Sequence, residues 1–146
     1  MYLPTDSPLS VSTPRGFKIK VRYIVYATPD KVFDALTQEA QIGEWCENGG
    51  FIEPHSGGKV NLFGTWITGS VIQFNKKKKQ LSYTWKPSEW DVKTKPSVVE
   101  FTFQPHAAGT ELTIDHSELP TQKEAAEHEK GWVDYVLDPL NDYFTH

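Results

Sequence analysis

Four stretches of the chain alternate between hydrophobic and polar residues, and a two-residue period is typical of a half-buried β-strand. They cover residues 17–27, 80–85, 99–103 and 109–119. In the first of them, for example, every second residue from Phe17 to Val25 is apolar, while lysine and arginine fill positions between. Short connections between such strands predict an antiparallel sheet, with a turn at residues 106–109 joining the last two.

Glycines punctuate the chain from Asn48 to Gly69, between the first and second of these strands. They occur as two pairs, at 49–50 and 57–58, and singly at 64 and 69. Short strands over residues 50–53, 59–63 and 68–74 fit between them. A glycine inside a strand often marks a bend or a bulge, which indicates a curved sheet.

Two short helices are predicted directly after the first strand. Thr28 is suited to cap a helix, Pro29 to occupy its first position, and Asp30 to lie at the positive end of its dipole. Val32, Phe33 and Leu36 then form an apolar stripe. A second helix is expected over residues 39–45.

The C-terminal fifth of the chain changes to a helical period. Thr121 followed by Glu124 matches a capping box, so the helix is expected to begin near residue 121 or 122. Its buried stripe contains Ala125, Trp132, Tyr135, Val136, Pro139, Leu140 and Tyr143. Pro139 is expected to kink or end this helix, because proline lacks an N–H and its ring clashes with the carbonyl of Tyr135.

The order of elements predicts an α+β fold in which a curved antiparallel sheet of about six or seven strands wraps around one long C-terminal helix. The 146 residues are enough for one domain. Residues 1–16, rich in proline, serine and threonine, are expected to form a flexible arm, and residues 17–146 the domain. Aromatic residues make up 13% of the chain, which favours a cavity lined with rigid rings.

Charge and cysteine content narrow the function classes. A formal net charge of −4 argues against nucleic acid as a partner, and the chain has no apolar run long enough to cross a membrane. The basic run Lys76–Lys79 is interpreted as a solvated hairpin loop, with an anion contact as the alternative. A single cysteine, Cys46, indicates a reducing compartment, so the expected location is the cytoplasm.

The residue pattern offers no cofactor or metal site. The histidines at positions 55, 106, 116, 128 and 146 show no metal-ligand spacing, and the chain contains no glycine-rich phosphate loop and no nucleophile elbow. Cys46 has no basic neighbour within three residues that would lower the pKa of its thiol. No catalytic residue, metal or cofactor is therefore assigned.

Several segments together resemble a known family. Ala27–Leu36 followed by Trp45 is similar to the opening of the activator of heat-shock-protein-90 ATPase homologue family. Later features match in order over residues 17–144: Leu81–Trp85, Gly109–Ile114 with His116, and His128 with Gly131-Trp132. That family belongs to the START-like (SRPBCC) superfamily with its helix-grip fold. The resemblance implies a sheet of seven or so strands around the long helix, with an apolar cavity between them.

The leading hypothesis is a binding domain, not an enzyme, that holds a small apolar or amphipathic ligand between the sheet and the C-terminal helix. His116 shares the apolar face of its strand with Leu112 and Ile114 and is the first candidate for a polar anchor. The candidate wall residues are Trp45, Phe51, Trp66, Trp85, Phe101, Phe103, His116, Trp132, Tyr135 and Val136. Each of them also has a plain interpretation as a core residue.

Two alternatives stay open. Some START-like relatives are cyclases or hydratases. Alternation puts Glu118 on the same face of its strand as His116, and His116 with Glu118 or with a buried tyrosine would then supply an acid and a base. The other alternative is an interaction module, either a homodimer or a chaperone-related protein, with an exposed apolar patch around Trp90. Eukaryotic chaperone activators carry this domain beside a separate N-terminal domain, which this chain lacks, so a chaperone partner is not expected.

Overall fold

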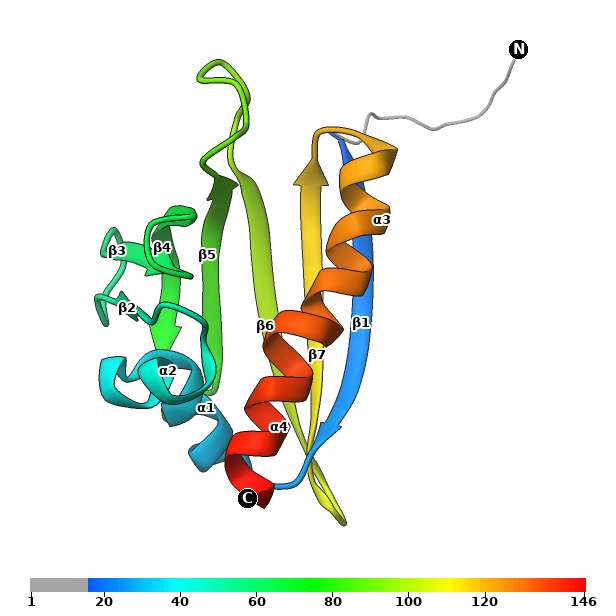
Figure 1. Cartoon of the computed structure of the whole chain (residues 1–146). Helices are drawn as coiled ribbons and strands as arrows, with labels where there is room; N and C mark the ends of the chain where they lie inside the picture. Colours follow the sequence, from blue (N-terminus) through cyan, green and yellow to red (C-terminus); the bar gives the residue numbers. More distant parts are fainter. Residues whose placement is uncertain (1–15) are drawn as a thin grey trace.

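A single antiparallel sheet forms the frame of the protein in the computed structural model, which describes residues 16–146 (Figure 1). The strand order is β1-β7-β6-β5-β4-β3-β2. The strands are β1 (Phe17–Val25), β2 (Gly50–Ile52), β3 (Lys59–Leu62), β4 (Ile67–Asn75), β5 (Gln80–Pro87), β6 (Ser97–His106) and β7 (Gly109–Leu119). The expected arm of residues 1–16 lies outside the described residues except for Gly16.

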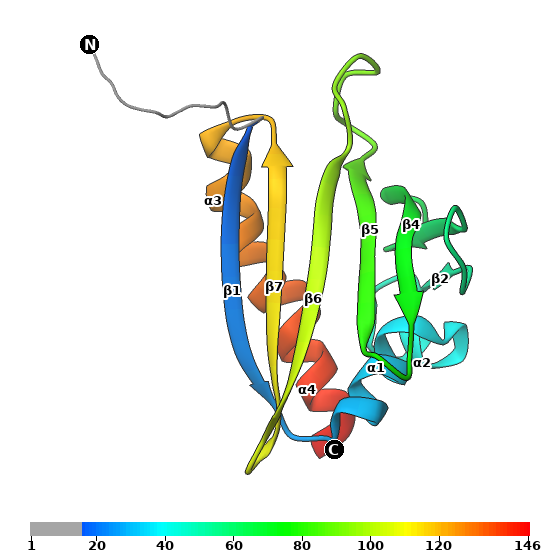
Figure 2. The same cartoon turned by 180° about the vertical axis from the view of Figure 1, so that it is seen from behind.

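The helices lie on one face of this sheet, as the two opposite views show (Figures 1 and 2). They are α1 (Pro29–Thr37), α2 (Glu39–Trp45), α3 (Gln122–Gly131), the π-helical segment η1 (Trp132–Leu137) and α4 (Asp138–Thr145). The last three follow one another without a break and cross β6, β7 and β1. The α+β architecture predicted from the hydrophobic pattern is confirmed, with seven strands and two short helices after the first.

The sheet bends where the glycine pattern predicted it. A Cβ atom at Gly69 on β4 would lie 1.8 Å from the carbonyl oxygen of Thr84 on β5, so only glycine allows the two strands to approach this closely. The register of the same strand pair shifts between Val71 and Gln73, which is a β-bulge. Glycine and bulge together fold the β2–β4 end of the sheet away from the long strands.

A second irregularity changes the side-chain direction at the end of β7. Phe17 pairs with Leu119 but Ile19 pairs with His116, so β7 carries an extra residue opposite β1. Glu118 takes it up with a φ of 60°. Leu119 consequently points into the core, while Glu118 is exposed. The prediction that Glu118 shares the inward face of His116 is wrong, because strict alternation ends at this bulge.

The C-terminal helix passes Pro139 and continues to Thr145, so an early end at this proline is wrong. Upstream of it the helix widens, and the backbone N–H of Asp138 donates to the carbonyl of Val133, five residues back. Pro139 then follows this wider turn, at the second residue of α4. The π-helical turn η1 is the structural response to this proline.

Aromatic rings fill the space between helix and sheet. Trp132 of η1 packs against Trp85 of β5, with ring centroids 4.7 Å apart, and against Phe101 of β6 at 6.0 Å. Phe33 of α1 packs against Phe103 of β6 at 5.4 Å. The long helix and α1 therefore share one aromatic core on the same face of the sheet.

The basic run lies at the β4–β5 hairpin, as predicted. Lys76 pairs with Asp34 at 2.9 Å, and Lys79 pairs with Asp30 at 2.5 Å. Both acids belong to α1. Hydrogen bonding to Lys79 lowers the pKa of the Asp30 carboxyl. Two of the four lysines thus attach the hairpin to α1.

The N-cap of α3 gives a first prediction. The side chain of Thr121 accepts a hydrogen bond from the backbone N–H of Glu124 at 3.0 Å, as the capping pattern predicted. We expect Thr121→Ala to lower the free energy of unfolding by about 1 kcal/mol. Urea unfolding followed by circular dichroism measures it. Thr121→Ser keeps the hydroxyl, and its free energy of unfolding should stay within a few tenths of a kcal/mol of the wild-type value. Equal losses of stability in both variants would contradict the capping role.

Candidate functional site

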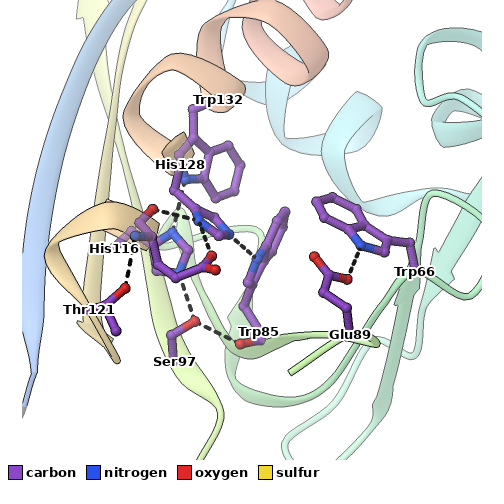
Figure 3. A network of polar contacts seen from close by, with 9 residues as sticks. Trp66, Trp85, Glu89, Ser97, His116, Thr121, His128 and Trp132 are labelled. Atoms are coloured by element: carbon purple, nitrogen blue, oxygen red, sulfur yellow. Dashed lines mark hydrogen bonds and ion pairs between the residues drawn. The ribbon is translucent and has the colours of Figure 1, made fainter. Parts of the chain in front are cut away.

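His116 lies at the centre of a buried polar network below the long helix (Figure 3). The indole N–H of Trp132 donates to Nδ1 of His116 at 3.0 Å. Nε2 of His116 therefore carries the proton and donates to Oγ of Ser97 at 2.8 Å. Ser97 in turn donates to the backbone carbonyl of Trp85 at 2.7 Å. Each polar atom in this chain of contacts has a partner.

His128 on α3 forms the counterpart of His116, with the opposite tautomer. Its Nε2 accepts from the indole N–H of Trp85 at 3.1 Å, and its Nδ1 donates to the backbone carbonyl of Glu124 at 2.8 Å. The two imidazole rings lie edge to face with centroids 5.0 Å apart. Two histidines and two tryptophans thus connect β5, β7 and the C-terminal helix through their side chains.

This environment keeps His116 neutral. Its side chain is fully buried, and burial together with the nearby His128 lowers the pKa of the His116 imidazole from 6.5 to about 3. A protonated ring would also present an N–H to the indole N–H of Trp132. His116 therefore holds the helix to the sheet, and both its nitrogens are already used. His116 is not among the lining residues of the pocket described below, so the structure does not place it as the expected polar anchor.

An open pocket of about 130 Å³ lies beside this network, between the long helix, β5 and the β3–β4 loop. Most of its lining residues are aromatic or acidic. The lining residues are Phe63, Trp66, Trp85, Glu89, Glu124, Glu127, His128, Gly131, Trp132, Tyr135 and Val136.

Two loops hold the outer wall in place. The backbone N–H of Ser88 donates to the carbonyl of Trp66 at 2.8 Å, and the indole N–H of Trp66 donates to Glu89 at 2.6 Å (Figure 3). Phe63 packs edge to face on Trp66 with ring centroids 5.8 Å apart. Trp66 and Tyr135 remain 40% and 59% exposed, respectively, so two large rings at the pocket face solvent while Trp85 and Trp132 form its buried wall.

Half of the ten residues predicted as the cavity wall line this pocket. They are Trp66, Trp85, Trp132, Tyr135 and Val136. The other five, Trp45, Phe51, Phe101, Phe103 and His116, lie elsewhere. Trp45, for example, is buried and donates its indole N–H to the carbonyl of Ala35. Phe101 and Phe103 belong to the core under the helix, and rings that pack on one another leave less room there than the sequence suggested.

Six lining residues were missed by sequence reasoning: Phe63, Glu89, Glu124, Glu127, His128 and Gly131. Four of them lie on the long helix at positions 124, 127, 128 and 131, which repeat with the helical period, and Tyr135 continues the series. That periodicity was a usable signal, because it places the acids and the predicted wall on one helix face. Glu89 comes from a loop between strands, and no pattern in the sequence brings it here.

Trp90 is not the exposed residue that the interaction hypothesis expected. It is half-buried, with its ring centroid 6.0 Å from that of His128. Its Nε1 is the one buried side-chain nitrogen or oxygen without a hydrogen-bond partner within residues 16–146. An apolar surface patch centred on Trp90 is therefore wrong, because its ring packs against the helix.

The geometry does not bring an acid–base pair together at His116. Glu118 is exposed and points away from it, so the proposed pairing of these two residues is wrong. Burial raises the pKa of the Cys46 thiol to about 11, which keeps it protonated. Within residues 16–146, no three histidine, cysteine or acidic side chains are grouped to hold a metal ion.

Two wider and more open hollows flank α1. One of about 460 Å³ involves Lys31, Asp34 and Gln41, and one of about 420 Å³ includes Asp34 and Lys76, which form an ion pair. Their polar side chains are partly paired with one another, and the aromatic pocket offers more apolar surface to a ligand. None of the helices between residues 16 and 146 is both long and apolar enough to span a bilayer.

A curved seven-stranded antiparallel sheet that holds one long C-terminal helix, with two short helices after its first strand, is a helix-grip fold of the START-like class. Over residues 26–145 the sequence matches the family described as "Activator of Hsp90 ATPase homolog 1-like protein", and the chain belongs to this family. The resemblance found in the sequence is confirmed. No curated protein matches the chain.

Solved structures show the same fold. The protein MLL2253 from Mesorhizobium loti is 26% identical, with a TM-score of 0.75 over 88% of this chain and 97% of that one. PFC0360w, described as an HSP90 activator from Plasmodium falciparum, is 21% identical, with a TM-score of 0.72 over 90% and 96%. CalU16 from Micromonospora echinospora is 26% identical, with a TM-score of 0.64 over 88% and 74%.

Proposed function

We propose that this protein binds a small apolar or amphipathic molecule in the pocket between the long helix, β5 and the β3–β4 loop. One observation carries the proposal: Trp66 and Tyr135 expose large rings at an opening whose inner wall is formed by Trp85 and Trp132. Exposed rings around a hollow leave apolar surface in contact with water unless something covers them. A ligand that enters the pocket would cover them.

The size of the pocket limits what enters. An apolar cavity of about 150 Å³ holds one benzene molecule, and this pocket measures about 130 Å³. It therefore suits one ring or a short branched chain, with any larger part of the ligand outside. A chain with a single cysteine forms no internal disulfide, which supports a reducing compartment, and the cytoplasm is the location that we propose.

The tryptophans allow a direct test with benzyl alcohol as a neutral one-ring probe. The chain has five of them, and Trp66, Trp85 and Trp132 line the pocket. In ¹⁵N-labelled protein we expect the indole N–H signals of these three to shift on titration. Trp45, whose indole N–H is bonded to Ala35 in the core, should stay in place and serves as an internal control.

A pair of tyrosine variants separates a pocket effect from a general surface effect. We expect Tyr135→Ala to weaken binding about three- to tenfold, because one aromatic contact contributes about 0.5–1.5 kcal/mol. Tyr26→Ala is the matched control, since Tyr26 is 58% exposed but does not line the pocket. Unchanged affinity in Tyr135→Ala, or equal losses in both variants, would contradict the proposed site. Native mass spectrometry of freshly purified protein would identify a ligand that co-purifies.

A further inference from the structure

The charged residues of the pocket all have the same sign. Glu89, Glu124 and Glu127 are among its lining residues, and no lysine or arginine is found among the lining residues of the described chain. The carboxylates come from two separate elements, because Glu89 precedes β6 and the other two lie on α3. An apolar hollow with a wholly acidic edge favours a ligand that carries a positive charge.

None of the three carboxylates is neutralised by a lysine or arginine in the structure of residues 16–146. Glu89 accepts the indole N–H of Trp66, a neutral donor that orients the carboxylate and leaves its charge in place. Glu124 lies 3.5 Å from Nδ1 of His128, but that N–H donates to the backbone carbonyl of Glu124. Glu127 is exposed, and no ion pair is recorded for it.

Two lysines close to these acids in the sequence are held by other groups, and Lys123, which precedes Glu124, forms no ion pair within residues 16–146. Lys130 on the same helix pairs with Asp134, one turn further on. Lys86 on β5 donates to the carbonyls of Val92 and Thr94 in the loop that follows. Lys86 and Lys130 therefore do not neutralise Glu89, Glu124 or Glu127, which form the acidic edge of the pocket.

The aromatic residues add to the attraction for a cation. The faces of tryptophan and tyrosine rings attract ammonium groups, and rings from four such residues line the pocket: Trp66, Trp85, Trp132 and Tyr135. Rings beside carboxylates form the combination that recognises organic ammonium ions. We propose that the ligand is a small organic ammonium ion, with its apolar part among the rings and its charged group at the glutamates.

The position of Glu124 alone has a simpler explanation, because an acid in the first turn of a helix interacts well with the helix dipole. That explanation does not extend to Glu127, which lies further along the helix, and it does not apply to Glu89 in a loop. The convergence of these two with Glu124 around one aromatic hollow carries the inference, which rests on the binding function proposed above.

Three one-ring compounds of different charge provide the test: benzylammonium, benzyl alcohol and benzoate. Dissociation constants come from the shifts of the Trp66, Trp85 and Trp132 indole signals at low ionic strength. We expect benzylammonium to bind about tenfold more tightly than benzyl alcohol, and benzoate more weakly than both. Raising the salt concentration should reduce this preference, because partly exposed charges are screened.

A double variant, Glu89→Gln/Glu127→Gln, removes two charges and keeps the size of both side chains. A glutamine oxygen at position 89 can still accept the indole N–H of Trp66. We expect benzylammonium to bind at least fivefold more weakly to this variant, and benzyl alcohol to lose much less affinity. Glu129→Gln is the matched control, since Glu129 is an exposed acid of α3 outside the pocket lining.

The outcomes separate the two proposals. Equal binding of benzylammonium and benzyl alcohol, or a benzylammonium affinity that the double variant leaves unchanged, would overturn the ammonium inference and leave the binding function standing. Tightest binding of benzoate would do the same. If none of the three compounds shifts the indole signals of Trp66, Trp85 and Trp132, the binding function fails and the ammonium inference fails with it.

Discussion

Trp132→Ala is expected to lower the free energy of unfolding by about 3–5 kcal/mol, the usual cost of truncating a buried aromatic side chain. Trp132 is 3% exposed and packs against Trp85 and Phe101. The variant also leaves Nδ1 of His116 without its donor in a fully buried place. Urea unfolding followed by circular dichroism measures the loss, and pocket binding should disappear along with the packing.

Two further tryptophan variants separate the contributions to this loss of stability. Trp132→Phe keeps a ring in the core but removes the hydrogen bond to His116, and we expect a cost of about 1–3 kcal/mol. Trp66→Ala removes a ring that is 40% exposed, and its cost should be smaller than that of Trp132→Ala. If Trp66→Ala destabilised the protein as much as Trp132→Ala, the central role given to Trp132 would be wrong.

Stability is expected to fall as the pH is lowered below about 6.5, because of His116. The folded protein keeps this imidazole neutral, with a pKa lowered to about 3, whereas the unfolded chain binds a proton near pH 6.5. The stabilisation is therefore fully present above pH 6.5 and is lost progressively towards pH 3. Between pH 7 and pH 5 the loss attributable to His116 amounts to about 2 kcal/mol.

Urea unfolding at several pH values, with and without the histidine, isolates this contribution. His116→Gln lowers stability at every pH but should flatten the pH dependence between pH 7 and pH 5 by the same ~2 kcal/mol. His146→Gln, at an exposed terminal residue, should keep the wild-type slope. A slope that His116→Gln leaves unchanged would mean that another group takes up the proton.

The frame of the fold could be predicted from the sequence because its signals are local. Alternation from Phe17 onward and over residues 109–119 marked strands, and the Thr121 cap marked where the last helix begins. Such periods follow from the backbone geometry of each element. They do not depend on which other element lies opposite.

The features that sequence reasoning missed depend on pairing between distant segments. The bulge at Glu118 arises from the register of β7 against β1, so counting by twos put this acid on the wrong face. Glu89 reaches the pocket because its loop is bonded to Trp66. Pro139 was expected to kink or end the helix, and the helix instead continues past it after a π-helical turn upstream. Each outcome was decided by tertiary packing.

The position of β1 beside β7 also determines when β1 can fold during synthesis of the chain. Val25 at the end of β1 pairs with Thr110, and Phe17 at its start pairs with Leu119. The first strand therefore leaves the ribosome long before its partner exists, with roughly 5–20 s between them at ordinary translation rates. During that interval its apolar face has no sheet to cover it. Folding of β1 is thus tied to the last part of the domain, and this edge of the sheet forms only after residues 110–119 have been made.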